Sequence, residues 1–223
     1  MKRLALLVFC LLMSLGTFAQ SSAIGAKGGL TVGLQRWNGQ QREALLSYNA
    51  SFVYEMIRTE TFSYLFDFGY HVKGSALRYQ GYDIQGNAIN TSIKDKFNNL
   101  SFIAGAKSAV DVGFSGGTLY YLLGVRLDYT INETVNSALN FDNFINRLNY
   151  GVTAGGGVEF KLSDRLLGFI EIQFSPDFSQ QVYTPPGTYF VNIGGTTYQR
   201  NWQEQKVINI PLELTVGMKF LRY

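Results

Sequence analysis

Apolar side chains recur at every second position in several separate stretches of this 223-residue chain. In the stretch over 207–220 the even positions are apolar, while the odd positions include Asn209, Glu213 and Lys219. Successive side chains of a β-strand point to opposite faces, so this period of two predicts strands with one apolar and one polar face. The alternation appears in eight segments: 23–35, 46–58, 62–78, 97–109, 118–130, 147–160, 166–175 and 206–220.

The connections between these segments alternate in length. The short ones are 59–61, 110–117 and 161–165, and the long ones are 36–45, 79–96, 131–146 and 176–205. Short periplasmic turns and long outer loops are typical of bacterial outer-membrane barrels, whose strands need about 9 to 11 residues each. The sequence therefore predicts an all-β fold, an eight-stranded antiparallel up-and-down transmembrane β-barrel located in the bacterial outer membrane.

A soluble eight-stranded barrel is the alternative for the same strand pattern. The chain is 46% hydrophobic and 15% aromatic. An eight-stranded barrel encloses only enough space for its own side chains or one small ligand, and rows of Tyr, Phe, Leu and Ile would overfill it. We therefore expect the apolar face to point to lipid and the small and polar face to point into the lumen.

The inward face of the predicted strands carries a nearly balanced set of charges. A charge on the lipid face costs about 2 to 4 kcal/mol at the membrane midplane, which decides the face that turns inward. The predicted polar network of the lumen comprises Lys27, Glu55, Asp67, His71, Lys73, Lys107, Arg126, Asp128, Glu159, Glu171, Glu213 and Lys219. We expect a packed salt-bridge core that plugs the barrel, because open porins have about 16 to 18 strands.

Aromatic residues are expected to form two belts at the two membrane interfaces. The belt near the periplasm would contain Tyr54, Phe62, Tyr64, Tyr121, Phe160, Phe169 and Phe220. The outer belt would contain Tyr48, Tyr70, Tyr129, Tyr150 and Phe174.

Pro211 interrupts the alternation of the last segment. Proline cannot donate a ladder hydrogen bond, and a closed barrel has no free edge at which that loss is harmless. We therefore expect a local β-bulge at Pro211.

Residues 1–19 match a secretory signal peptide, with two basic residues, an apolar run over 4–15 and Ala19 at the cleavage site. The run is shorter than the roughly 20 residues that a spanning helix needs. Cleavage would leave 20–223 as the barrel domain and remove Cys10, the single cysteine. The remaining 17 basic and 16 acidic residues give no excess charge that would attract nucleic acid.

The outer loops are the expected site of recognition, since wall and lumen are committed to folding. Gly86-Asn87 and Gly194-Gly195 lie between apolar or aromatic runs and predict hairpins that rise above the membrane. The candidate recognition residues, for a protein or glycan partner, are Tyr82, Tyr189, Phe190, Tyr198 and Trp202. The loop over 131–146 is expected to form a short helix over the barrel mouth.

His71 is the only histidine, and Asp67, His71 and Ser75 share one strand face. Residues four apart in a strand lie about 13 Å apart, whereas a general base must lie within about 3 Å of its partner. The three residues therefore cannot form a triad, and the chain is predicted not to be an enzyme. The alternative is a small outer-membrane enzyme, a lipid deacylase or protease, centred on His71. No cofactor is expected, and one His without Cys disfavours a metal site.

Three segments resemble PorT-like outer-membrane β-barrel proteins. They are Asn149–Phe160 (NYGVTAGGGVEF), Gly25–Leu30 (GAKGGL) and the closing Ile208–Leu214 with Gly217–Phe220 (INIPLEL and GMKF). The resemblance implies an integral eight-stranded barrel of OmpA/OmpX type, in a family whose founding member is linked to protein secretion. We therefore expect a structural or interaction role through the outer loops, accessory to secretion or surface assembly. The expected partners are outer-membrane lipid and the barrel-assembly machinery during insertion, and the expected state is a monomer.

Overall fold

The structure is a computed structural model that describes residues 21–39, 41–82, 85–110, 117–135, 144–193 and 196–222. The predicted signal peptide lies outside these ranges, as do Gly194-Gly195 and positions 136–143 of the loop that was expected to be helical. No helix among the described residues is long and apolar enough to cross a membrane.

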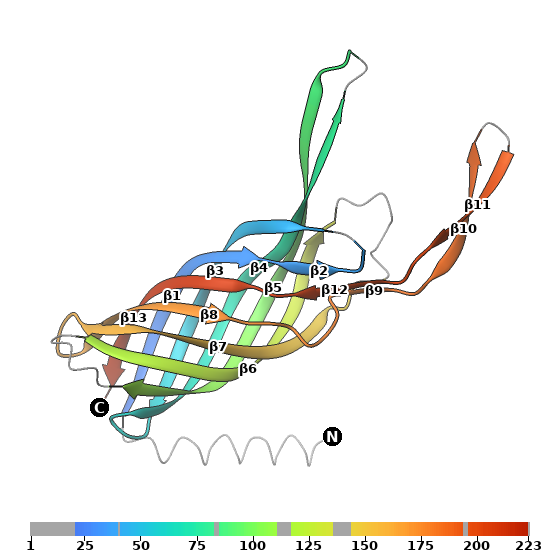
Figure 1. The fold of residues 1–223 in the computed structure, drawn as a ribbon. Helices are drawn as coiled ribbons and strands as arrows, with labels where there is room; N and C mark the ends of the chain where they lie inside the picture. The colour runs from blue at the N-terminus through green and yellow to red at the C-terminus, as the bar shows by residue number, and fades with distance from the viewer. Residues whose placement is uncertain are drawn as a thin grey trace, which may run out of the picture.

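Eight antiparallel strands form a closed ring (Figure 1). In ring order they are β1 (Ser21–Gly33), β13 (Leu212–Arg222), β8 (Leu166–Phe174), β7 (Leu148–Lys161), β6 (Gly117–Thr134), β5 (Ala88–Val110), β4 (Phe62–Tyr82) and β3 (Glu43–Ile57). The first and last strands, β1 and β13, pair with each other and close the barrel. The predicted eight-stranded up-and-down barrel is confirmed.

The strand register places the two faces of each strand as the alternation predicted. Phe52 on β3 pairs with Phe68 on β4, and both point outward, with Phe52 72% exposed. One position along, Asp67 points inward and is 1% exposed. Large apolar side chains exposed all around the wall are suited to lipid contact.

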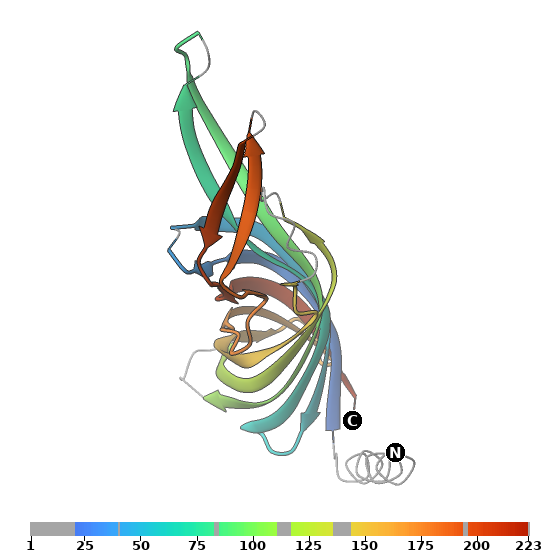
Figure 2. The same ribbon diagram turned by 90° about the vertical axis from the view of Figure 1, so that its right-hand side faces the viewer.

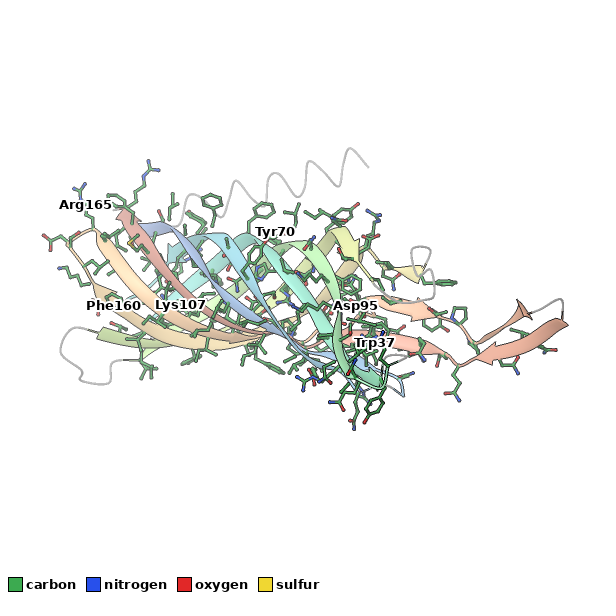
Figure 3. All side chains as sticks on the ribbon, turned by 90° about the horizontal axis from the view of Figure 1, so that it is seen from above. Trp37, Tyr70, Asp95, Lys107, Phe160 and Arg165 are labelled. Atoms are coloured by element: carbon green, nitrogen blue, oxygen red, sulfur yellow. The ribbon has the colours of Figure 1, made fainter. Side chains whose placement is uncertain are left out.

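The two ends of the barrel differ in their connections. At the turn end, the turns over 58–61 and 162–165 close tightly, with Arg58 N bonded to Phe62 O and Leu162 N bonded to Leu166 O. The loop end carries the long connections. Figure 3 shows Phe160 and Arg165 at the turn end and Trp37 and Asp95 at the loop end.

A small three-stranded sheet lies at the loop end. It consists of β2 (Gln35–Trp37), β12 (Gln205–Asn209) and β9 (Val182–Thr184), with β12 in the middle. Its strands come from the first and last long connections, so these two loops fold together over the barrel mouth rather than separately (Figure 1).

The expected bulge at Pro211 is wrong, because the strand divides there instead. The predicted segment 206–220 becomes β12 and β13, separated by Ile210 and Pro211. Ile210 N donates to Leu34 O, and Pro211 O accepts a hydrogen bond from Ser175 N. The missing proline N–H thus coincides with the point where the chain leaves the barrel wall and joins the three-stranded sheet.

Two hairpins project beyond the barrel at the loop end (Figures 1 and 2). In the first, which we call ribbon A, 77–82 of β4 pairs with 88–93 of β5 beyond the last barrel pairs. In the second, ribbon B, β10 (Gly187–Ile193) pairs with β11 (Thr196–Trp202). Both predicted hairpins are therefore present, and strands β4 and β5 are longer than the alternation indicated.

Candidate functional site

The barrel interior is filled by the side chains of the predicted polar network. The structure places all twelve of them inside the ring, with Glu159 half-buried and the other eleven buried. They form three levels along the barrel between the turn end and the loop end.

The level nearest the turn end contains two lysines that share two glutamates. Lys107 Nζ lies 3.0 Å from Glu55 Oε1 and 2.5 Å from Glu159 Oε1. Lys219 contacts the same two carboxylates. The four residues come from four strands, β3, β5, β7 and β13, so the cluster joins separate parts of the ring. A cavity of 170 Å³ lies beside it and opens at the turn end.

The middle level is centred on Lys27. Its Nζ lies 2.6 Å from Asp67 Oδ2 and 2.7 Å from Glu171 Oε1. Tyr120 Oη donates a hydrogen bond of 2.8 Å to the second oxygen of Glu171. Burying a charge is costly unless it is paired and hydrogen-bonded, and these contacts supply both conditions.

An apolar layer lies within the lumen beside Lys27, and sequence reasoning missed it. It consists of the buried residues Val53, Leu65, Tyr120 and Leu122. The cavity at this level measures 10 Å³, which is at the lower limit for holding one water molecule. Tyr120, Leu122 and Arg126 occupy alternate positions of β6, so all three side chains point to the inward face. This alternation was the sequence signal that could have predicted the apolar layer.

Phe169 belongs to this interior rather than to an aromatic belt, and its predicted place in the periplasmic belt is wrong. It is 3% exposed, and Lys219 Nζ lies 5.4 Å from the centre of its ring. Phe169 lies two residues before Glu171 on β8, so both side chains point to the inward face. Its ring occupies the space that the absent side chain of Gly217 leaves free.

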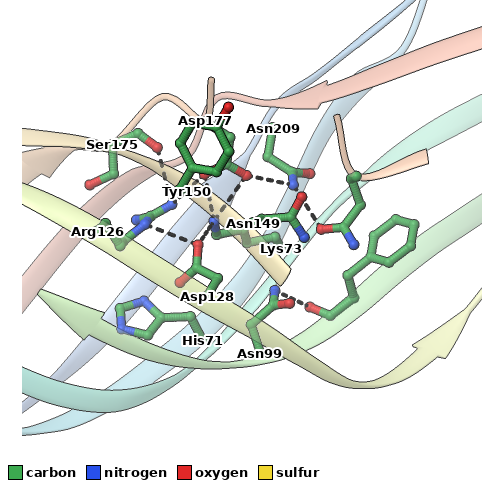
Figure 4. A network of polar contacts seen from close by, with 12 residues as sticks. His71, Lys73, Asn99, Arg126, Asp128, Asn149, Tyr150, Ser175, Asp177 and Asn209 are labelled. Carbon is green, nitrogen blue, oxygen red and sulfur yellow. Dashed lines mark hydrogen bonds and ion pairs between the residues drawn. The ribbon is translucent and has the colours of Figure 1, made fainter. Parts of the chain in front are cut away.

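The upper level surrounds Asp177 (Figure 4). Asp177 Oδ1 lies 3.0 Å from Lys73 Nζ and 3.2 Å from Arg126 Nη2. Asp128 completes the group through Lys73 and through Arg126 Nε at 3.1 Å. The sequence pattern placed Asp177 in a loop. However, the inward-pointing positions of β8 continue in steps of two through Ser175 to Asp177. A backbone bridge from Asp177 to Gly151 continues the pairing beyond the end of β8.

His71 also lies at the upper level, 1% exposed, with Nδ1 2.8 Å from Glu213 Oε1. Asp67, His71 and Ser75 share one face of β4 as predicted, but each contacts a different strand or loop. Their respective partners are Lys27, Glu213 and Gln35. The three side chains are therefore not brought together.

A hydrophobic cap closes the loop end. It consists of Trp37, Phe97, Val182 and Val207, against which Val135, Phe144 and Ile145 pack. The guanidinium of Arg42 lies 4.0 Å from the Trp37 ring centre, and its Nη1 lies 2.8 Å from Asp95 Oδ2. Phe144 and Ile145 come from the loop that was expected to cover the mouth, so its described end does so.

Ribbon A exposes both of its faces. Tyr82 is 80% exposed, near the tip. The register places Leu77, Ile89 and Ile93 on one face and Arg78 on the other, with Tyr82.

Ribbon B contains four of the five candidate recognition residues, which are Tyr189 and Phe190 on β10 and Tyr198 and Trp202 on β11. Its backbone register pairs Tyr189 with Arg200 and Phe190 with Gln199. The side chains of these four candidates lie outside the described part of the structure.

Within the described ranges, no group of three His, Cys, Asp or Glu side chains is placed to hold a metal ion. The carboxylates of the lumen are instead paired with lysine and arginine.

No protein-family profile and no curated protein sequence matches this chain. Among solved structures, it is similar to the Neisserial surface protein A, with 13% identity, a TM-score of 0.50, and 89% of this chain and 96% of that chain covered. The N-terminal β-barrel domain of Pseudomonas aeruginosa OprF matches with 9% identity, a TM-score of 0.47, and coverage of 91% and 97%. The attachment invasion locus protein of Yersinia pestis, Ail, matches with 12% identity, a TM-score of 0.40, and coverage of 90% and 98%. At these identities the likeness concerns the fold, and the resemblance to PorT-like proteins stays a prediction.

Proposed function

We propose that this chain is an integral outer-membrane barrel that recognises a protein partner through its two ribbons, with the loop end outside the cell and the turn end in the periplasm. The observation that carries the proposal is the projection of ribbon A beyond a barrel whose interior is filled. Six residues beyond Ala76 extend it by about 20 Å at the usual rise per residue.

The filled lumen favours recognition over transport. Ion pairs at three levels, an apolar layer and the Trp37 cap occupy the length of the barrel. A solute would have to displace buried charges from their partners, which costs several kcal/mol for each charge. The exposed ribbons need no such rearrangement.

The edges of ribbon A favour a protein partner. Pairing of β3 with β4 stops at Glu43 and Ala76, and pairing of β5 with β6 stops at Lys96 and Thr134. Among the described residues, both edges of the ribbon beyond these pairs have no strand beside them. Unpaired N–H and C=O groups at such an edge bind an extended peptide by strand addition. An exported protein bound in this way would fit an accessory role in secretion or surface assembly.

The environment of His71 supports a role without catalysis. Its side chain is buried and contacts Glu213 at the upper level of the lumen, below the Trp37 cap. A lipid or peptide substrate would have to pass the cap or the wall to reach it. The ribbons, in contrast, are open to a large partner.

The experiment compares complementation of a deletion strain by three forms of the chain, with the surface and secreted proteins measured by mass spectrometry. The first is the wild-type chain, the second is His71→Ala, and the third replaces 79–91 by Asn-Gly. That dipeptide suits a two-residue turn between Arg78 and Ser92, which are paired in ribbon A.

We expect the wild type and His71→Ala to restore the parental profile, and the ribbon-trimmed variant to reach the membrane without restoring it. Restoration by the trimmed variant together with failure of His71→Ala would favour the enzyme instead. Folding of each variant is checked by its heat-dependent gel mobility.

A further inference from the structure

A groove runs across the lipid-facing wall near the turn end. It has a volume of 540 Å³ and crosses β1, β13 and β8, and its lining is mainly apolar. The outward positions in β1 are the small residues Ala26 and Gly28, whereas Val216 and Met218 project from the neighbouring β13. Small residues between larger ones hollow the wall at this place.

A second apolar hollow, of 310 Å³, lies on β1, β3, β4 and β5. It is lined by Ala50, Phe52, Phe68 and Tyr70 among others, and it shares Ala26 and Lys27 with the first groove. Two apolar hollows that meet at Ala26 and Lys27 on β1 are suited to a ligand with two apolar chains.

The rim beside the groove carries two exposed arginines, Arg165 and Arg222. They lie on neighbouring chain segments at this rim, since Leu221 N donates to Arg165 O and Arg222 follows Leu221. Within the described part of the chain neither side chain has an ion-pair partner, whereas the nearby Lys161 is paired with Asp164 at 2.9 Å. Figure 3 shows Arg165 at the turn end, beyond Phe160, which lines the groove.

The distance between the charges and the groove suits one amphipathic molecule. Arg222 and Met218 lie four residues apart on β13, which corresponds to about 13 Å along the strand. Arginine binds phosphate through paired N–H groups, and an ion pair at the membrane interface is less screened than one in water. The occupant therefore has a phosphate at the interface and acyl chains beside the barrel wall.

We propose that this surface is a binding site for one diacyl glycerophospholipid of the leaflet at the turn end, with its phosphate on Arg165 and Arg222 and its acyl chains in the two hollows. A bound lipid would cover the part of the wall where the small residues Ala26 and Gly28 leave a groove. It would also fix the depth of the turn end in the membrane. The proposal concerns the barrel wall and is independent of the ribbons.

Native mass spectrometry of the detergent-purified, delipidated barrel tests the site, with dilauroyl phosphatidylglycerol as the probe. Arg165→Gln with Arg222→Gln removes the charges, and Ala26→Leu with Gly28→Leu fills the groove. A Cβ at Gly28 has its nearest neighbour, Asn49 O, at 3.4 Å, so the added side chain has room outside the wall. The matched controls are Arg78→Gln, a cation of the loop end, and Val125→Leu, a lipid-facing position on β6.

We expect one phospholipid per wild-type barrel, with binding weakened about ten-fold or more in both double variants and unchanged in both controls. Equal binding by all five proteins would overturn the proposal. So would equal retention of dilauroyl glycerol, which lacks the phosphate, because the arginines would then contribute nothing. A barrel dimer in place of the lipid adduct would assign the groove to a second copy of the chain and also refute it.

Discussion

His71 Nδ1 on β4 lies 2.8 Å from Glu213 Oε1 on β13, although the two strands are not neighbours in the ring. Strands β1 and β3 lie between them, so this contact crosses the lumen. Lys27 on β1 similarly reaches Glu171 on β8 across β13. Contacts of this kind join strands that share no ladder hydrogen bonds. They therefore stabilise one shape of the barrel cross-section.

Lys27→Met is expected to destabilise the folded barrel strongly. The substitution leaves the buried carboxylates of Asp67 and Glu171 without this cation, and breaking a buried pair in this way costs about 3 to 5 kcal/mol. Urea unfolding in detergent micelles measures the loss. Lys161→Met, which removes the exposed pair with Asp164, is the control and should leave the unfolding midpoint unchanged. Equal midpoints for the two variants would show that the central ion pairs do not stabilise the fold.

Gly157→Val is expected to disturb the apolar layer of the lumen. A Cβ at this inward position would lie 2.8 Å from Tyr120 Oη and would overlap the backbone oxygen of Ile170. Overpacking of this kind costs about 1 to 3 kcal/mol in the free energy of unfolding. Gly28→Ala adds a Cβ on the outer wall, where ordinary contact distances are kept, and should change the free energy little. The prediction fails if the two substitutions have the same effect.

Trp37→Ala is expected to loosen the cap while the barrel stays folded. Truncating a buried tryptophan costs about 3 to 5 kcal/mol, and here the loss falls on the three-stranded sheet that carries Trp37 and Val207. Limited proteolysis should cut the loops at the loop end faster than in the wild type, with the heat-dependent gel mobility retained. Phe178→Ala, at an exposed apolar position, is the control. Unchanged proteolysis would mean that the cap does not hold these loops.

The purified barrel should give no conductance steps in a planar bilayer, because ion pairs and the apolar layer fill its interior. A porin measured under the same conditions provides the positive control. Stable ohmic steps from the wild-type barrel would show that the lumen opens to ions.

The period of two was sufficient to predict the ring and the face of each strand, because a one-residue change of register would place Asp67 or Arg126 in lipid. Local features were harder to predict. Pro211 marks a change of strand partner that depends on β2 and β9, which are far away in the sequence. Asp177 points into the lumen from an irregular continuation of β8 past Pro176. This continuation is too short for its alternation of inward and outward residues to be recognised in the sequence.

The pairings within the lumen also depend on geometry that alternation does not contain. The alternation along each strand places Lys107 and Glu55 inside the barrel. Closure of the ring, however, decides that Lys107 contacts both Glu55 and Glu159. The length of ribbon A was likewise not predicted, since its exposed strands have no lipid or core to impose a pattern.

Cysteine labelling on intact cells tests most directly the claim that the ribbons face outward from a membrane-embedded barrel. In a Cys10→Ser background, Ser92→Cys places one thiol on ribbon A, and Ser163→Cys places one in a turn at the other end. We expect a membrane-impermeant maleimide to label the ribbon thiol on intact cells, and the turn thiol only after the outer membrane is permeabilised. Labelling of the turn thiol alone on intact cells would contradict the orientation, and with it the proposed role of the ribbons.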